Sequence, residues 1–162
     1  MYISTNLQGV IIMKKKLTAY LAGLMLMSSA TAFAAIPSTD IALGDVQPGM
    51  SINDAVAAFG EPRYRDHGEK ATFSNGIKIE LDDYSHSTIE EIQLSRNGSA
   101  ATPAGITIGS SENAVIEAYG QPDKMEYDDG KQEYTYYASD SGMKMEFKIL
   151  RGSVVKIKCD ID

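Results

Sequence analysis

The 162-residue chain contains no tryptophan, one cysteine and two histidines. A single cysteine excludes an internal disulfide, so the fold must rest on its hydrophobic core. Cys159 occupies an alternating position near the C-terminus, which predicts a buried packing residue rather than a nucleophile. His67 and His86 fall in segments with loop composition, and their spacing matches no metal-ligand motif. We therefore expect no metal site and no cofactor.

Sequence motifs of catalysis are also missing. The chain has no phosphate-binding glycine loop, no nucleophile elbow and no Cys/His pairing. The acidic clusters at 82–83 and 126–129 lack the alternating oxygen ligands of a calcium loop, and we interpret them as solvated turns. The sequence thus predicts that the protein is not an enzyme, although a pair of carboxylates for glycoside hydrolysis can always be assembled in space.

Long hydrophobic runs are absent except in the first 34 residues, which have the pattern of a leader. Three lysines at 14–16 precede an apolar stretch at 17–27, and the following Ala-Phe-Ala fits the small-x-small rule for cleavage. We expect cleavage between Ala34 and Ala35. The apolar stretch is too short for a transmembrane helix, so no stable membrane insertion is expected after cleavage.

Met13 stands directly before the three lysines, where a signal peptide would begin. We therefore interpret residues 1–12 as an upstream extension produced by a misplaced start codon. The predicted location of the protein is secreted or periplasmic.

The negative net charge of the chain limits the class of partner that it can bind. Removal of the leader removes three lysines and no acid, so the formal net charge changes from −7 to −10. Such a charge argues against nucleic acids and against anionic lipid surfaces, both of which attract basic proteins. The remaining 128 residues, 35–162, suffice for one compact domain or two very small ones.

One stretch of sequence occurs twice. Residues 49–62 (GMSINDAVAAFGEP) recur as residues 109–122 (GSSENAVIEAYGQP) without a gap. Each copy predicts a helix with a serine cap, an apolar stripe at helical spacing and a Gly-x-Pro stop signal. Ser51 and Asp54 fit a capping box, and Ser110 or Ser111 takes the cap position in the second copy. Every repeated residue has a structural role, so the repeat indicates an architecture and no site.

After each predicted helix the hydrophobic period changes from 3.6 to 2. The Asn75-Gly76 pair predicts a hairpin turn between two of the strands. We predict an α+β fold of two tandem α-β-β-β repeats, 35–98 and 99–162, whose helices pack on one or two antiparallel sheets. The expected strands are residues 71–74, 77–82, 89–96, 133–138, 143–149 and 155–159.

The doubled motif followed by a β-meander resembles the BamE/SmpA-like superfamily, and the tandem arrangement resembles the β-lactamase inhibitory proteins. The resemblance covers both predicted repeats, 35–98 and 99–162, and hence nearly all of the chain after the leader. It implies the fold described above and a role in protein binding rather than catalysis. The chain departs from the family in having no lipid-attachment cysteine, no tryptophan and no disulfides, so no individual site residue is carried over.

Candidate binding residues come from the second predicted repeat. Tyr134 and Tyr136 share one face of a strand and Tyr137 takes the other, so at least one tyrosine faces outward, as at many protein interfaces. Outward positions are mostly acidic in the first repeat and basic in the second. An acidic face beside a basic face would bind a dipolar protein surface, whereas the alternative is an ordinary solvated sheet. The basic candidates are Lys144, Lys148 and Lys156.

The sequence thus leads to one function hypothesis and one alternative. The first is an exported, non-catalytic protein-binding module of the cell envelope, whose partner is another envelope or secreted protein. The alternative is a small-molecule or cell-wall ligand-binding protein, or an enzyme, that uses a cleft between the two repeats.

Overall fold

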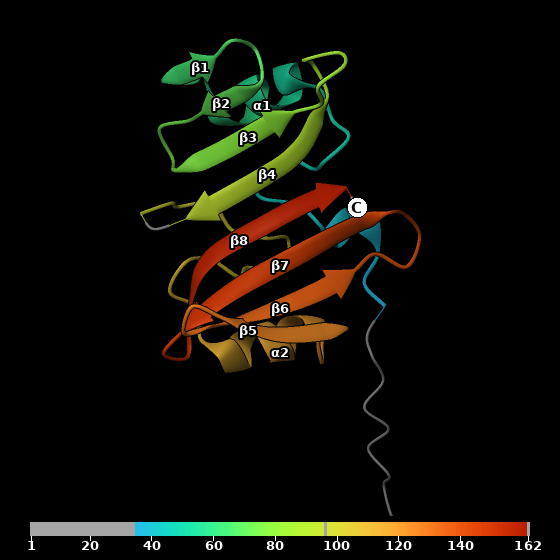
Figure 1. The fold of residues 1–162 in the computed structure, drawn as a ribbon, viewed down its shortest axis with the longest axis vertical. Coiled ribbons are helices and arrows are strands. Elements are labelled where there is room, and N and C mark those ends of the chain that lie inside the picture. Colours follow the sequence, from blue (N-terminus) through green and yellow to red (C-terminus); the bar gives the residue numbers. More distant parts are fainter. Residues whose placement is uncertain (1–34, 96, 162) are drawn as a thin grey trace, which may run out of the picture. The chain divides into compact units, whose positions relative to one another are not determined.

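A computed structural model describes residues 35–95 and 97–161 of the chain, and the predicted leader lies outside these residues. Eight antiparallel strands form one sheet in the order β1-β2-β3-β4-β8-β7-β6-β5 (Figure 1). The helical elements are η1 (Ser38–Asp40), α1 (Ile52–Phe59) and α2 (Glu112–Tyr119). The strands are β1 (Tyr64–Asp66), β2 (Lys70–Thr72), β3 (Ile77–Leu81), β4 (Ile89–Ser95), β5 (Lys124–Asp128), β6 (Lys131–Tyr137), β7 (Met143–Leu150) and β8 (Ser153–Ile161).

The predicted α+β fold of two tandem α-β-β-β repeats with helices packed on the sheet is wrong. One continuous antiparallel sheet dominates the described residues, which contain only two α-helices of eight residues each. Four strands, not three, follow each helix in the chain. The sheet is continuous because β4 pairs directly with β8, with Ile92 opposite Cys159 and Leu94 opposite Ile157. This pairing places four apolar side chains on one face, where a shared core buries them.

The two helices begin and end at the predicted signals. The hydroxyl of Ser51 accepts from the N–H of Asn53 at 3.1 Å, and the N–H of Ser51 donates to the carboxylate of Asp54 at 2.9 Å, which confirms the capping box. In α2 the cap is Ser111. Gly60 and Gly120 follow the helices with φ angles of 81° and 76°, a conformation that side-chain-bearing residues avoid.

The core lies on one face of the sheet. Alternate residues of the central strands point to this face and are almost fully buried, and the helices lie behind the sheet on the same side (Figure 1). The segment 36–46 and Ile106 contribute further buried apolar side chains. Cys159 is completely buried, which confirms the prediction of a packing residue, and burial raises the pKa of its thiol.

The two strands that the sequence did not predict, β1 and β5, are the edges of the sheet. Tyr64 on β1 and Met125 and Tyr127 on β5 remain largely exposed, so neither edge strand shows the alternation of buried and polar residues that marks a half-buried strand. Strand β5 also includes part of the acidic cluster 126–129, so the interpretation of that whole cluster as a turn is wrong. The actual turn is Asp129-Gly130, where both φ angles are positive, as in a two-residue hairpin.

None of the helices in the described residues is long and apolar enough to span a bilayer.

Candidate functional site

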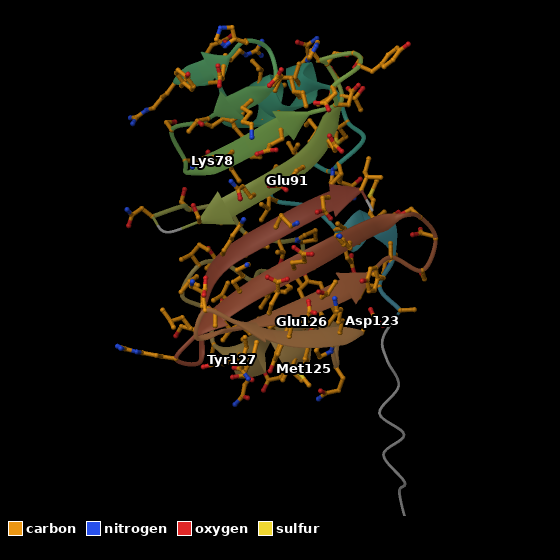
Figure 2. All side chains as sticks on the ribbon, viewed as in Figure 1. Lys78, Glu91, Asp123, Met125, Glu126 and Tyr127 are labelled. Carbon is orange, nitrogen blue, oxygen red and sulfur yellow. The ribbon has the colours of Figure 1, made fainter. Side chains whose placement is uncertain are left out.

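The face of the sheet opposite the core, called here the open face, is covered by charged side chains. Alternation along β3, β4, β8, β7 and β6 turns polar residues to this side (Figure 2), with register shifts at Glu80/Leu81 and Lys148/Ile149. Because antiparallel sheets commonly bury one face and solvate the other, the pattern follows from the register. The charged residues of the open face on these strands include Lys78, Glu80, Glu91, Lys156, Lys158, Asp160, Lys144, Glu146, Lys148 and Glu133.

Lys158 is the centre of an ion-pair network on this face. Its Nζ atom lies 2.7 Å from Asp160, 2.8 Å from Glu146 and 3.8 Å from Glu91. Burial lowers the pKa of Lys158, but the hydrogen bonds to Asp160 and Glu146 outweigh this effect and hold the pKa above its ordinary value of 10.5. The network therefore links three strands, β4, β8 and β7, through one cation.

Two further lysines are bound to neighbouring carboxylates. The Nζ atom of Lys148 lies 2.9 Å from Glu133 on β6, and that of Lys144 lies 3.8 Å from Glu146 and 3.9 Å from Asp160. These pairs are partly shielded from solvent, so salt screens them less than it screens fully exposed pairs.

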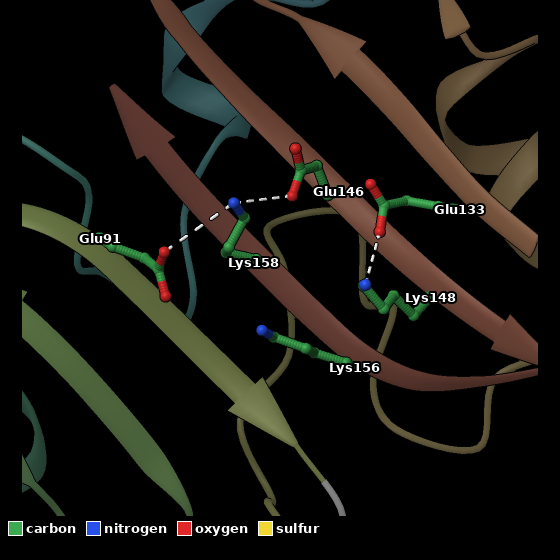
Figure 3. Close-up of a pocket in the computed structure, with 6 residues that line it drawn as sticks. All are labelled: Glu91, Glu133, Glu146, Lys148, Lys156 and Lys158. Atoms are coloured by element: carbon green, nitrogen blue, oxygen red, sulfur yellow. Dashed lines mark ion pairs between the residues drawn. The ribbon is translucent and has the colours of Figure 1, made fainter. Parts of the chain in front are cut away.

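A shallow depression of about 270 Å³ lies within this network, between β4, β8, β7 and β6 (Figure 3). Partial burial raises the pKa of Glu91, which stands on its β4 side. Three carboxylates and three ammonium groups line the depression, so it is suited to charged or strongly polar groups rather than to apolar ligands. The lining residues are Glu91, Glu133, Glu146, Lys148, Lys156 and Lys158.

The three predicted tyrosines have different environments. Tyr134 and Tyr136 are buried in the core, and only Tyr137, 39% exposed, lies on the open face. The hydroxyl of Tyr134 donates to the side chain of Glu112 at the start of α2, and burial with this contact raises the pKa of Tyr134 to about 12. The hydroxyl of Tyr136 donates to the carbonyl of Gly120 at the end of α2, at 3.0 Å. The two buried tyrosines thus hold both ends of α2 against the sheet through hydrogen bonds from their hydroxyl groups.

The three predicted lysines lie together on the open face, on β7 and β8. They do not form a basic face beside an acidic one, because the pairing of β4 with β8 brings Glu91 next to Lys158 and mixes the two signs. Sequence reasoning omitted the carboxylates from the candidate site. Glu133 directly precedes Tyr134 on β6, and Tyr134 is buried. Because neighbouring residues of a strand point to opposite faces, this order could have indicated that Glu133 points outward.

Other features of the described surface have less organised chemistry. No group of three or more potential metal ligands occurs among the described residues. His67 and His86 are exposed, as expected of loop histidines. Two more depressions, of about 240 and 350 Å³, lie near the β1–β3 edge and beside the loop around Asp45.

Comparison with known proteins identifies no family for the chain. No family model and no curated protein matches it. Among solved structures, a DUF4309 family protein from Bacillus subtilis is similar, with 14% identity, a TM-score of 0.47 and coverage of 69% of this chain and 78% of that one. A cysteine-rich secretory protein from Staphylococcus aureus shows 12% identity, a TM-score of 0.46 and coverage of 80% of this chain and 49% of that one. Neither protein carries a function over to this chain.

Replacing Lys158 by methionine is expected to destabilise the protein by about 2 kcal/mol at pH 7, because three partly buried carboxylates lose their shared cation. Since the lysine pKa is raised, its contribution is complete at neutral pH and is lost only as the pH rises above 10.5. In the variant the acids repel one another when ionised, so the loss should be smaller at pH 4. Urea unfolding at both pH values, with Lys78→Met as control, measures this. An equal loss at both pH values would refute the electrostatic explanation.

Proposed function

We propose that the chain is an exported, non-catalytic protein-binding module of the cell envelope, and that its open face is the binding surface. The observation that carries the proposal is a broad face formed by five strands. Most of its charged side chains are held in place by ion pairs, and no described segment covers it. Side chains that are already ordered lose less entropy on association than free ones. The leader pattern predicted in the first 34 residues supports the proposed location.

The proposal favours a polar, electrostatically guided interface over a hydrophobic one. Tyr137 is an exposed aromatic residue of the open face, at the end of β6 and beside Lys144 on β7. Tyrosine and charged groups together are typical of the centre and rim of transient protein interfaces. Complementary charges chiefly raise the association rate and the specificity, so binding should weaken as salt is added.

A pull-down of envelope proteins tests the proposal. The processed chain, residues 35–162, is expected to retain a protein partner at low salt, and the Lys144→Glu, Lys148→Glu, Lys156→Glu variant is expected to lose at least about tenfold of the capture. The matched control replaces three arginines away from the centre of the open face, Arg63, Arg65 and Arg151, by glutamate and changes the net charge equally.

The control distinguishes a local interface from a general charge effect. Circular dichroism must show both variants folded, because Lys148→Glu removes the pair with Glu133. If both variants lose the partner equally, or if the lysine variant retains it, the open face is not the binding surface.

A further inference from the structure

Of the three lysines that line the depression, Lys156 is the one that forms no ion pair with a described residue. The strand register places it opposite Lys148 on β7 and opposite Ser95 on β4. Like charges directly opposite each other in a sheet are destabilising, and a serine offers no compensating charge. By contrast, Lys158, one pleat along the same strand, stands opposite Glu146.

The ion pairs in the depression confirm this asymmetry (Figure 3). Each of the three lining glutamates has a lysine within 3.8 Å: Glu91 and Glu146 have Lys158, and Glu133 has Lys148. Among the residues that the structure describes, Lys156 has no carboxylate within ion-pair distance; it acts on Glu91 only from further away, where its charge opposes the rise in the pKa of Glu91. Its ammonium group projects into the depression, which is large enough for a carboxylate side chain.

We infer that Lys156 is the anchor for a carboxylate of the partner protein, an aspartate or glutamate that completes the charge pairing of the depression. This inference rests on the proposed protein-binding function and names the chemistry that the binding surface takes. An incoming carboxylate stabilises Lys156 and screens its repulsion with Lys148, so the gain on binding exceeds that of an isolated surface pair.

The surrounding acids restrict which anion fits. Glu91, Glu133 and Glu146 border the same depression and repel a multiply charged group such as a phosphate or a nucleic acid backbone. A single carboxylate flanked by hydrogen-bond donors or cations avoids this repulsion. The flanking groups pair with the three glutamates, while the carboxylate pairs with Lys156. In an extended segment, residues two positions apart face the same side, so the expected recognition element is an acidic residue with basic residues at −2 and +2.

Peptide titration followed by NMR tests the inference. The probe is the capped heptapeptide Ser-Lys-Ser-Glu-Ser-Lys-Ser, and the control probe carries glutamine in place of the glutamate. The purified protein is expected to bind the glutamate peptide about fivefold more tightly than the glutamine peptide, with the largest shifts at the Lys156 amide and Nζ signals. Lys156→Gln should abolish the difference between peptides. Arg65→Gln should leave it unchanged, because Arg65 is exposed on the edge strand β1 and stands opposite the buried Ala71, away from the open face.

Thermal unfolding gives a second, independent readout. Because Lys156 opposes Lys148, Lys156→Gln is expected to raise the Tm by about 2 °C. A lower Tm would show that Lys156 serves the fold and would overturn the inference, as would equal binding of the two peptides. If Lys156→Gln still captures the partner that the triple lysine variant loses, the inference fails while the proposed function stands. Loss of capture by both variants supports both.

Discussion

Replacing Phe147 by alanine is expected to destabilise the fold by about 4 kcal/mol and to lower the Tm by more than about 10 °C. Phe147 on β7 is completely buried at the centre of the core. Its ring lies 5.6 Å from that of Tyr119 on α2 and 5.9 Å from that of Tyr136 on β6, the second contact being edge-to-face at 85°. Truncation therefore removes the transfer free energy of the ring, opens a cavity and breaks two aromatic contacts.

The control for this effect is Phe147→Leu, which keeps most of the apolar volume and should cost only about 1.5 kcal/mol. Both values come from urea unfolding monitored by far-UV circular dichroism, with the free energy extrapolated to water. A decrease in unfolding free energy below about 2 kcal/mol for the alanine variant would show that the core closes around the cavity. The cluster of the Tyr119, Tyr136 and Phe147 rings would then not be what holds α2 against the sheet.

The central strands and the helix ends were predictable from the sequence, because local chemistry determines them. A serine with an acid three residues later, followed by a Gly-x-Pro stop, defines α1 within its own segment. In β3 and β7 every second residue is apolar, since only one face is buried. The edge strands β1 and β5 bury too little apolar surface to leave such a pattern.

The strand order was not predictable, and it changes the fold class. The pairing of β4 with β8 joins residues that are 69 positions apart at the Glu91–Asp160 pair, and nothing in either segment alone specifies the other. Without that pairing, two small units with their own helices were the natural expectation. With it, one sheet dominates and the helices become minor elements on one face.

The candidate site was predictable only in part, for the same reason. The outward direction of Lys148 and Lys156 follows from alternation, but their position opposite each other requires the register of β7 and β8. The tyrosines were ambiguous because tyrosine suits either face: its ring packs in a core, and its hydroxyl finds a partner there. Tyr136 does so with the carbonyl of Gly120.

Replacing Gly76 by alanine is expected to cost about 3 kcal/mol, far more than a turn glycine usually contributes. Gly76 has a φ of +85°, where a side chain costs about 1 kcal/mol. A Cβ atom there would also lie 2.7 Å from the Cα atom of Gly98, so the backbone of the turn after β2 or of the turn after β4 must move. Overpacking of this kind costs about a further 2 kcal/mol.

Gly130→Ala separates the two contributions, because Gly130 has a similar φ of +76° in the β5–β6 turn, but no described atom lies within 4 Å of the position that a Cβ atom would take there. Its expected cost is about 1 kcal/mol, from backbone strain alone. The difference between the two variants in urea unfolding therefore measures the contact between the turns at Gly76 and Gly98. Equal losses of stability in the two variants would mean that the backbone around Gly98 moves away from the new side chain at no energetic cost. The contact between Gly76 and Gly98 would then not stabilise the β3–β4 hairpin beside β8.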